Sequence, residues 1–270
     1  MIYVQSGRNV KIAVYDLNPT GSKQTILMIH GWPLSHKIYE YQEELLTQRG
    51  YRVVSLDLRG FGASDTPADG YSYDQLSDDI YNVVRFLELR DFILVGFSMG
   101  GGIVCRYMGR HNSYGVRKLV LLAAAAPSFT RRPDFPYGVT RASVDQLIQQ
   151  ARTDRPRMAA MFGGMLFNNV HSREVLEWFR DISWEASGIG TIQTAISLRD
   201  EDCRPDMKKI KVPTGIFHGK KDQIVPYDLA LVQQKEIAGA MLYPFDNSGH
   251  GIFYDELALF NQRFMEFVQK

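Results

Sequence analysis

The sequence feature that most constrains the fold is a Gly-x-Ser-x-Gly motif that follows a short apolar run. Residues 92–95 are rich in β-branched and aromatic types and predict a buried strand, and residues 103–108 predict a helix. Ser98 stands at the sharp turn between them, where a strained backbone favours glycine two positions away on either side, as at Gly96 and Gly100. This context predicts that Ser98 is a nucleophile. The motif alone also fits a Gly-rich turn in another α/β protein, so the rest of the chain has to decide.

Length and charge restrict the class of protein. A chain of 270 residues fits one large α/β domain, or one domain with an insertion. A net charge of +1 favours neither nucleic acid nor an anionic membrane as a partner. The longest apolar run, residues 119–126, is too short to span a bilayer, and the first residues lack the pattern of a signal peptide. We therefore expect a soluble, cytoplasmic protein, and a homo-oligomer remains open.

The two cysteines do not form a disulfide framework, which predicts a reducing compartment. Cys105 falls on the helix after Ser98 and is interpreted as a small core residue. Cys203 lies in a run of charged residues, which predicts an exposed thiol.

Strand and helix patterns alternate through most of the chain. Beyond the strand before Ser98, strands are predicted at residues 10–15, 25–29, 51–56, 116–123, 214–217 and 240–243, and helices at 38–48, 74–89, 227–238 and 254–268. This alternation predicts an α/β fold with a mostly parallel twisted sheet and helices on both faces. Ligand sites in such sheets lie at the carboxyl ends of the strands.

The pattern changes between Pro127 and Pro205. Four prolines interrupt the first part, and the helical pieces at residues 144–151, 157–165, 173–182 and 189–197 have no convincing strands between them. We interpret residues 127–205 as a helical lid over the strand ends, and residues 1–126 and 206–270 as the core.

A nucleophilic serine needs a base, and the base needs a carboxylate that orients it. Asp222 and His250 each follow a late predicted strand and lie 28 residues apart, so their loops should be neighbours of Ser98. For the carboxylate, Asp246 is the stronger alternative, whereas Asp228 opens a helix and is explained by capping.

Two other histidines compete for the role of the base. His30 and His218 each precede a glycine at a strand end. His30 comes before the predicted carboxylate in the sequence, so both are interpreted as residues that support the shape of their loops. The order Ser98, Asp222, His250 favours His250 as the base.

The oxyanion of a tetrahedral intermediate should be bound by two backbone N–H groups. One belongs to Met99, which follows the serine, and the other to Trp32, in the loop after an early central strand. Asp57 and Arg59 indicate loop structure more than chemistry. The spacing of His, Cys, Asp and Glu predicts no metal, and the glycines after Ser98 lack the context of a phosphate-binding loop.

With these residues in view, the chain resembles the α/β-hydrolase superfamily over nearly its whole length, and in particular the bacterial arylesterases, cofactor-free haloperoxidases and perhydrolases. The resemblance is carried by residues 30–35 (HGWPLS), 57–64 (DLRGFGAS), 96–102 (GFSMGGG) and 249–251 (GHG), and by Asp222. It implies acyl-enzyme chemistry without a cofactor on a small-molecule ester. Pro33 resembles the proline of members that accept hydrogen peroxide as well as water.

The expected activity is therefore hydrolysis of small or aromatic carboxylic esters, with perhydrolysis as a side activity. Apolar residues expected to line the substrate pocket are Phe129, Phe162, Trp184 and Ile224, for each of which core packing is the alternative. A lactonase, an amidase or a C–C bond hydrolase with the same triad remains open, as do a non-catalytic small-molecule receptor and a cofactor-independent oxygenase.

Overall fold

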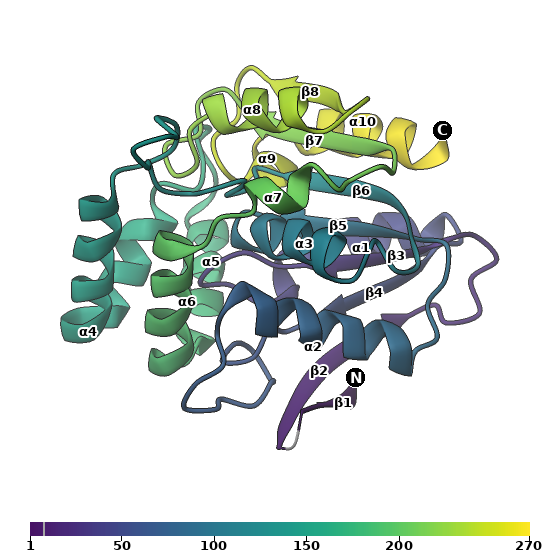
Figure 1. The fold of residues 1–270 in the computed structure, drawn as a ribbon, viewed down its shortest axis with the longest axis horizontal. Coiled ribbons are helices and arrows are strands. Elements are labelled where there is room, and N and C mark those ends of the chain that lie inside the picture. The colour runs from purple at the N-terminus through teal and green to yellow at the C-terminus, as the bar shows by residue number, and fades with distance from the viewer. Residues whose placement is uncertain (8) are drawn as a thin grey trace.

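A mostly parallel sheet lies at the centre of the structure, a computed structural model that describes residues 1–7 and 9–270 (Figure 1). Within these residues the sheet has eight strands in the order β1-β2-β4-β3-β5-β6-β7-β8. The strands are β1 (Ile2–Ser6), β2 (Val10–Leu17), β3 (Thr25–Ile29), β4 (Arg52–Leu56), β5 (Phe92–Phe97), β6 (Val116–Leu122), β7 (Thr214–Gly219) and β8 (Met241–Phe245). The first two strands pair antiparallel, β2 also runs antiparallel to β4, and the remaining neighbours are parallel.

The continuous apolar runs became the central strands. All six residues of β5 are buried, because helices cover both faces of the sheet there. The register places Gly96 of β5 beside Ile29 of β3 on one side and Leu121 of β6 on the other. The end of β5, and the turn that follows it, is therefore in the middle of the sheet.

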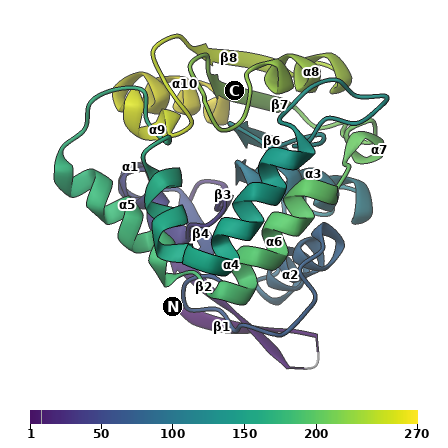
Figure 2. The ribbon, with the colours of Figure 1, turned by 90° about the vertical axis from the view of Figure 1, so that its left-hand side faces the viewer.

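Helices cover the two faces of the sheet, as Figures 1 and 2 show from perpendicular directions. One face carries α1 (Glu40–Gln48), α9 (Ile252–Asp255) and α10 (Leu257–Gln269), and the other carries α2 (Tyr73–Phe86), α3 (Met99–Arg110), α7 (Arg204–Met207) and α8 (Asp228–Glu236). None of the helices in the described part of the chain combines the length and apolar character needed to cross a bilayer.

Three further helices form a group beside the sheet: α4 (Arg141–Gly163), α5 (Arg173–Glu185) and α6 (Gly188–Asp200) (Figure 2). Side chains of Ser172 and Ser187 cap the N-termini of α5 and α6. The two helices expected at 144–151 and 157–165 both lie within α4, which consists of two helical segments separated by a kink at Asp154, where the backbone is non-helical (φ −152°, ψ 70°), two residues before Pro156. Pro156 lies in the first turn of the second segment, where a proline is tolerated, and the Arg157 N–H of that turn donates to the Asp154 side chain at 3.1 Å.

The structure differs from the sequence analysis at two places. The sequence analysis did not predict strand β1, which pairs in register with β2, for example Val4 with Ile12. Cys203 is fully buried rather than exposed, because the charged residues around it turn to Arg106 on α3, which pairs with Glu201 and Asp206. Burial raises the pKa of the Cys203 thiol to about 12, so it is not a reactive cysteine.

Candidate active site

Ser98 occupies the turn between β5 and α3 with a backbone φ of 53° and ψ of −120°. A positive φ is unfavourable for any residue with a Cβ and is maintained here by tight surroundings. A Cβ on Gly96 would lie 2.6 Å from the carbonyl oxygen of Gly100, and a Cβ on Gly31 would lie 2.8 Å from the Cβ of Ser98. The Ser98 hydroxyl does not cap α3, so its Oγ is not engaged by the helix that it precedes.

Asp222, in the loop after β7, contacts His250, in the loop after β8. The Oδ2 atom of Asp222 lies 2.7 Å from Nδ1 of His250, and Oδ1 accepts the N–H groups of Ile224 (2.8 Å) and Val225 (2.9 Å). Burial alone would raise the pKa of Asp222, but the adjacent charge of His250 and the hydrogen bonds from His218 and His250 hold it well below its ordinary value. Asp222 is therefore an ionised carboxylate that orients the His250 ring.

The second nitrogen of His250 is available. Donation of the Nδ1 proton to Asp222 assigns the tautomer in which Nε2 carries a lone pair. Nε2 is buried and has no hydrogen-bond partner among the described residues. The ring packs on Phe97, the residue directly before Ser98, with centroids 4.7 Å apart. His250 thus presents an unpaired, buried acceptor beside the element that carries the serine.

Two of the three competing residues in this part of the chain have other partners. Asp246 is exposed and pairs with Lys220 at 2.7 Å, so it does not hold His250. Asp228 is the first residue of α8 and does not cap it, so the expected capping role is wrong: the N-cap position is Tyr227, and the buried Oδ1 of Asp228 has no hydrogen-bond partner among the described residues. The Nε2 atom of His218 lies 2.9 Å from the carbonyl oxygen of Val225 and 3.2 Å from Asp222 Oδ2, so this histidine supports the Asp222 loop.

His30 also has a structural role. Its Nε2 accepts the Leu58 N–H at 3.0 Å, and its Nδ1 lies 2.8 Å from the carbonyl oxygen of Gly31, so both ring nitrogens are used. Asp57 accepts hydrogen bonds from His36, and Arg59 forms a buried ion pair with Asp79. The carboxylate and guanidinium of this loop therefore bind different partners instead of each other.

The backbone around Ser98 offers unpaired donors. Met99 is the first residue of α3, where N–H groups have no partner within the helix. In the described residues, the N–H groups of Met99 and Trp32 donate to no protein acceptor. Both lie next to the serine, Met99 through the chain and Trp32 through Gly31, whose backbone approaches the Ser98 Cβ.

Ser98 opens into a small apolar cavity of about 20 Å³. It is lined by Trp32, Ser98, Ala125, Phe129, Leu147, Phe162, Leu198 and Ile224. The indole of Trp32 meets the Phe162 ring edge to face at 5.0 Å and donates its N–H to the Thr191 carbonyl at 2.9 Å. Three of the four apolar residues expected from the sequence therefore line this cavity.

Trp184 does not line the cavity. Its side chain is 41% exposed, lies under the Arg180 guanidinium and donates its indole N–H to the Pro156 carbonyl. Trp184 lies on the outward face of α5, and the spacing of apolar residues in the sequence did not show which face of this helix turns outward. Pro33 is buried outside the cavity lining. Leu147 and Leu198 also line the cavity, but the sequence analysis did not name them. Their apolar side chains within or next to predicted helices were the only sequence signal for this role.

Known proteins share this arrangement of elements. The family model described as alpha/beta hydrolase fold matches residues 24–257. The chain belongs to the α/β-hydrolase family. Its homologues include esterases and non-heme haloperoxidases, which supports ester hydrolysis in general.

Three similar proteins illustrate the range of this α/β hydrolase's relatives. It is 45% identical over 265 residues to the AB hydrolase superfamily protein YisY of Bacillus subtilis, covering 98% of both chains. The esterase EaEST from Exiguobacterium antarcticum has a TM-score of 0.96 at 44% identity, with 99% of both chains covered. The bifunctional esterase/perhydrolase DCH of Acinetobacter calcoaceticus is 30% identical, with both chains covered completely.

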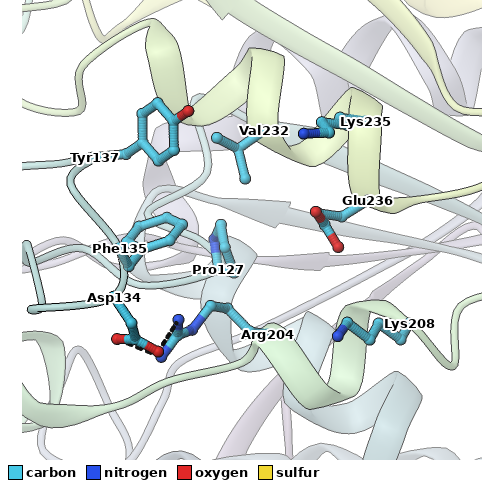
Figure 3. Close-up of a pocket in the computed structure, with 9 residues that line it drawn as sticks. All are labelled: Pro127, Asp134, Phe135, Tyr137, Arg204, Lys208, Val232, Lys235 and Glu236. Carbon is cyan, nitrogen blue, oxygen red and sulfur yellow. Dashed lines mark hydrogen bonds and ion pairs between the residues drawn. The ribbon is translucent and has the colours of Figure 1, made fainter.

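The α/β hydrolase has a larger pocket of about 290 Å³ elsewhere, shown in Figure 3. It is lined by Pro127, Asp134, Phe135, Tyr137, Arg204, Lys208, Val232, Lys235 and Glu236. Charges of both signs face this pocket, and Arg204 is already paired with Asp134 at 2.8 Å. It shares no residue with the Ser98 cavity and has no serine or histidine in its lining, so its size does not make it the catalytic centre. Among the described residues, no three His, Cys, Asp or Glu side chains are grouped as metal ligands.

Proposed function

We propose that this α/β hydrolase is a serine esterase that cleaves small or aromatic carboxylic esters through an acyl-enzyme on Ser98. One observation carries the proposal: His250 is held by Asp222 through Nδ1, at 2.7 Å, while its Nε2 is buried and unpaired beside the turn of Ser98. A base that is oriented on one side and free on the other is the arrangement that activates a serine hydroxyl.

The proposed reaction has two steps. The Oγ atom of Ser98 attacks the ester carbonyl carbon while Nε2 of His250 takes the hydroxyl proton, and the same proton then passes to the departing alcohol. A water molecule, activated by His250 in turn, attacks the acyl-enzyme and releases the acid. The ionised Asp222 stabilises the imidazolium in both steps.

Two backbone donors support the oxyanion in this mechanism. Met99 directly follows Ser98, and Trp32 follows Gly31, whose backbone approaches the Ser98 Cβ. The N–H groups of both residues have no protein acceptor in the described residues. Each such donor contributes roughly 3–4 kcal/mol to transition-state stabilisation. Because backbone atoms provide the donors, the side chain of Met99 is not required chemically.

The size and chemistry of the cavity favour a small apolar acyl group. A volume of about 20 Å³ holds little more than one water-sized sphere, and the walls are apolar apart from Ser98. Phe129, Phe162 and Ile224 are proposed as substrate-binding residues. A charged acyl group would lose its hydration without gaining a partner there.

We extend the proposal to hydrogen peroxide as an alternative acyl acceptor, which would give a peracid. The support is Pro33, directly after Trp32, and the relative named as a bifunctional esterase/perhydrolase. A peracid oxidises halide without a metal, which would account for a haloperoxidase activity.

We also propose that residues 127–205 act as the lid of the catalytic core formed by residues 1–126 and 206–270. The support is that Phe129, Leu147, Phe162 and Leu198 of the proposed lid face Ser98 of the proposed core in one cavity.

The test is a series of p-nitrophenyl esters of increasing chain length, with Ser98→Ala and the exposed control Ser22→Ala. We expect Ser98→Ala to lose hydrolysis and Ser22→Ala to keep it. Retention of full activity by folded Ser98→Ala would refute the mechanism. Lactone, amide and diketone substrates distinguish the other hydrolases that use such a triad, and acetate with peroxide tests peracid formation in wild type and Pro33→Ala.

A further inference from the structure

The loop that carries His250 is attached to the segment that connects α4 and α5, here called the α4–α5 connection (residues 164–172). The N–H of Gly251 donates to the Leu166 carbonyl at 2.7 Å, and the Asn168 amide donates to the Asn247 carbonyl at 2.9 Å. These hydrogen bonds lie on both sides of His250 in the sequence. The α4–α5 connection is therefore a wall of the His250 loop.

Close packing reinforces this attachment. A Cβ on Gly249 would lie 2.9 Å from the Asn168 backbone nitrogen, and a Cβ on Gly251 would collide with the Phe167 ring. The glycines on either side of His250 thus allow the α4–α5 connection to approach more closely than any other residue would. The two segments therefore pack directly against each other, with no side chain of Gly249 or Gly251 between them.

One carboxylate, that of Asp255, binds both segments. Its Oδ2 accepts the N–H of Gly249 at 2.7 Å and the N–H of Asn168 at 2.8 Å. Its Oδ1 accepts the N–H of Asn169 at 3.1 Å and lies 2.8 Å from Nε2 of His171. The side chain is fully buried, so four protein donors replace its hydration.

The neighbouring acid has a narrower role. Glu256 accepts the N–H of Asn247 at 3.1 Å and the hydroxyl of Ser248 at 2.7 Å, both within the His250 loop. Asp255 differs because it joins the residue before His250 to the α4–α5 connection. That connection begins directly after α4, which carries Phe162 into the Ser98 cavity.

We propose that Asp255 is a positioning residue that couples the position of the His250 imidazole to the position of α4 and α5 over Ser98. This inference rests on the proposed function, in which His250 is the base and Phe162 bounds the acyl pocket. Through Gly249, Asp255 sets where the imidazole stands; through Asn168, Asn169 and His171, it holds the wall of the pocket.

Replacement by asparagine is the sharpest variant. Asp255→Asn keeps the volume but places an NH₂ donor among four donors, so two of them lose their acceptor. A misplacement of the catalytic group by about 1 Å costs on the order of 100-fold. We expect kcat to fall on the order of tenfold or more, with a rise in KM because the pocket wall loosens as well. The matched control is Asp246→Asn, an exposed acid of the same loop, which should stay within about twofold of wild type.

His171 offers a second, milder pair of variants that does not touch the His250 loop. His171→Phe removes one donor to Asp255, whereas His171→Gln retains a side-chain N–H. We expect His171→Phe to lower kcat and raise KM, and His171→Gln to restore both toward wild type. If Asp255→Asn does not fold, this pair decides the question.

Hydrogen exchange supplies a readout that does not depend on activity. In the Ser98→Ala background, Asp255→Asn should accelerate amide exchange in residues 164–171 and 246–251 together. A loss of thermal stability with unchanged kcat and KM, or faster exchange in only one segment, would overturn the proposal. Failure of a fluorophosphonate probe to label Ser98 of wild type would refute the serine mechanism instead, while the exchange experiment still tests the coupling.

Discussion

The Nδ1 atom of His250 lies 2.7 Å from Oδ2 of Asp222, although the two residues are 28 positions apart and follow different strands. The contact is buried, and the carboxylate is also bound by two backbone N–H groups of its own loop. It determines which nitrogen of His250 carries the proton, and this leads to the first prediction.

Asp222→Asn should lower kcat for p-nitrophenyl acetate by roughly 10⁴-fold with the fold retained. An asparagine that donates to Nδ1 favours the tautomer with the proton on Nε2, which then cannot accept the serine proton. Steady-state kinetics with a thermal melt checks this. The control is Asp246→Asn, which changes an exposed acid paired with Lys220 and should behave as wild type. Equal losses of kcat in the two variants would contradict the proposed role of Asp222.

His30 should make stability depend on pH. Burial lowers the pKa of His30 from the ordinary 6.5 to about 4, because a charged ring would lose its hydration there. The neutral ring also accepts the Leu58 N–H. The neutral form in the folded state therefore contributes stability that is complete above the unfolded pKa of about 6.5 and is lost as the pH falls toward 4. Denaturant unfolding at pH 7 and 4.5 should show wild type losing about 2–3 kcal/mol more than His30→Gln. Parallel losses in the two proteins would argue against this source.

The cavity at Ser98 should set the acyl-chain preference. Phe162→Ala removes a ring from the cavity wall, so kcat/KM should shift from acetyl toward butyryl or hexanoyl esters. The control is Met161→Ala, the next residue along α4, whose side chain is 54% exposed. Trp184→Ala should likewise leave the chain-length profile unchanged, since Trp184 is outside the cavity. A shift in either control with none in Phe162→Ala would place the acyl pocket elsewhere.

Two ion pairs should differ in their effect on stability. Arg59 and Asp79 are joined by two hydrogen bonds of 2.6 Å in a buried setting, so Asp79→Ala leaves a buried guanidinium unpaired and should cost about 3–5 kcal/mol of unfolding free energy. Lys37 and Glu185 are each more than 40% exposed, so Glu185→Ala should cost less than about 1 kcal/mol. Chemical denaturation of both variants measures the contrast; a similar cost in both would contradict it.

Local patterns were sufficient to predict the central strands, the helices that cover them and the turn at Ser98. The reason is that buried parallel strands leave continuous apolar runs, and a strained turn leaves glycines at fixed offsets. The order of Ser98, Asp222 and His250, read with strand ends, predicted one rim for all three, and the contact between the last two is present. Their catalytic roles remain a prediction that the proposed variants test.

Contacts between distant segments were decided only by the tertiary structure. Cys203 is buried because Arg106 of another helix binds the charges around it, and Trp184 faces outward because α5 packs through its opposite side. The sequence around Asp255 does not predict its binding partners. Asn168, Asn169 and His171, which bind its carboxylate, lie more than 80 positions earlier in the chain. Periodicity reports whether a face is apolar, but the partner of a polar group is set by how separate elements come together in space.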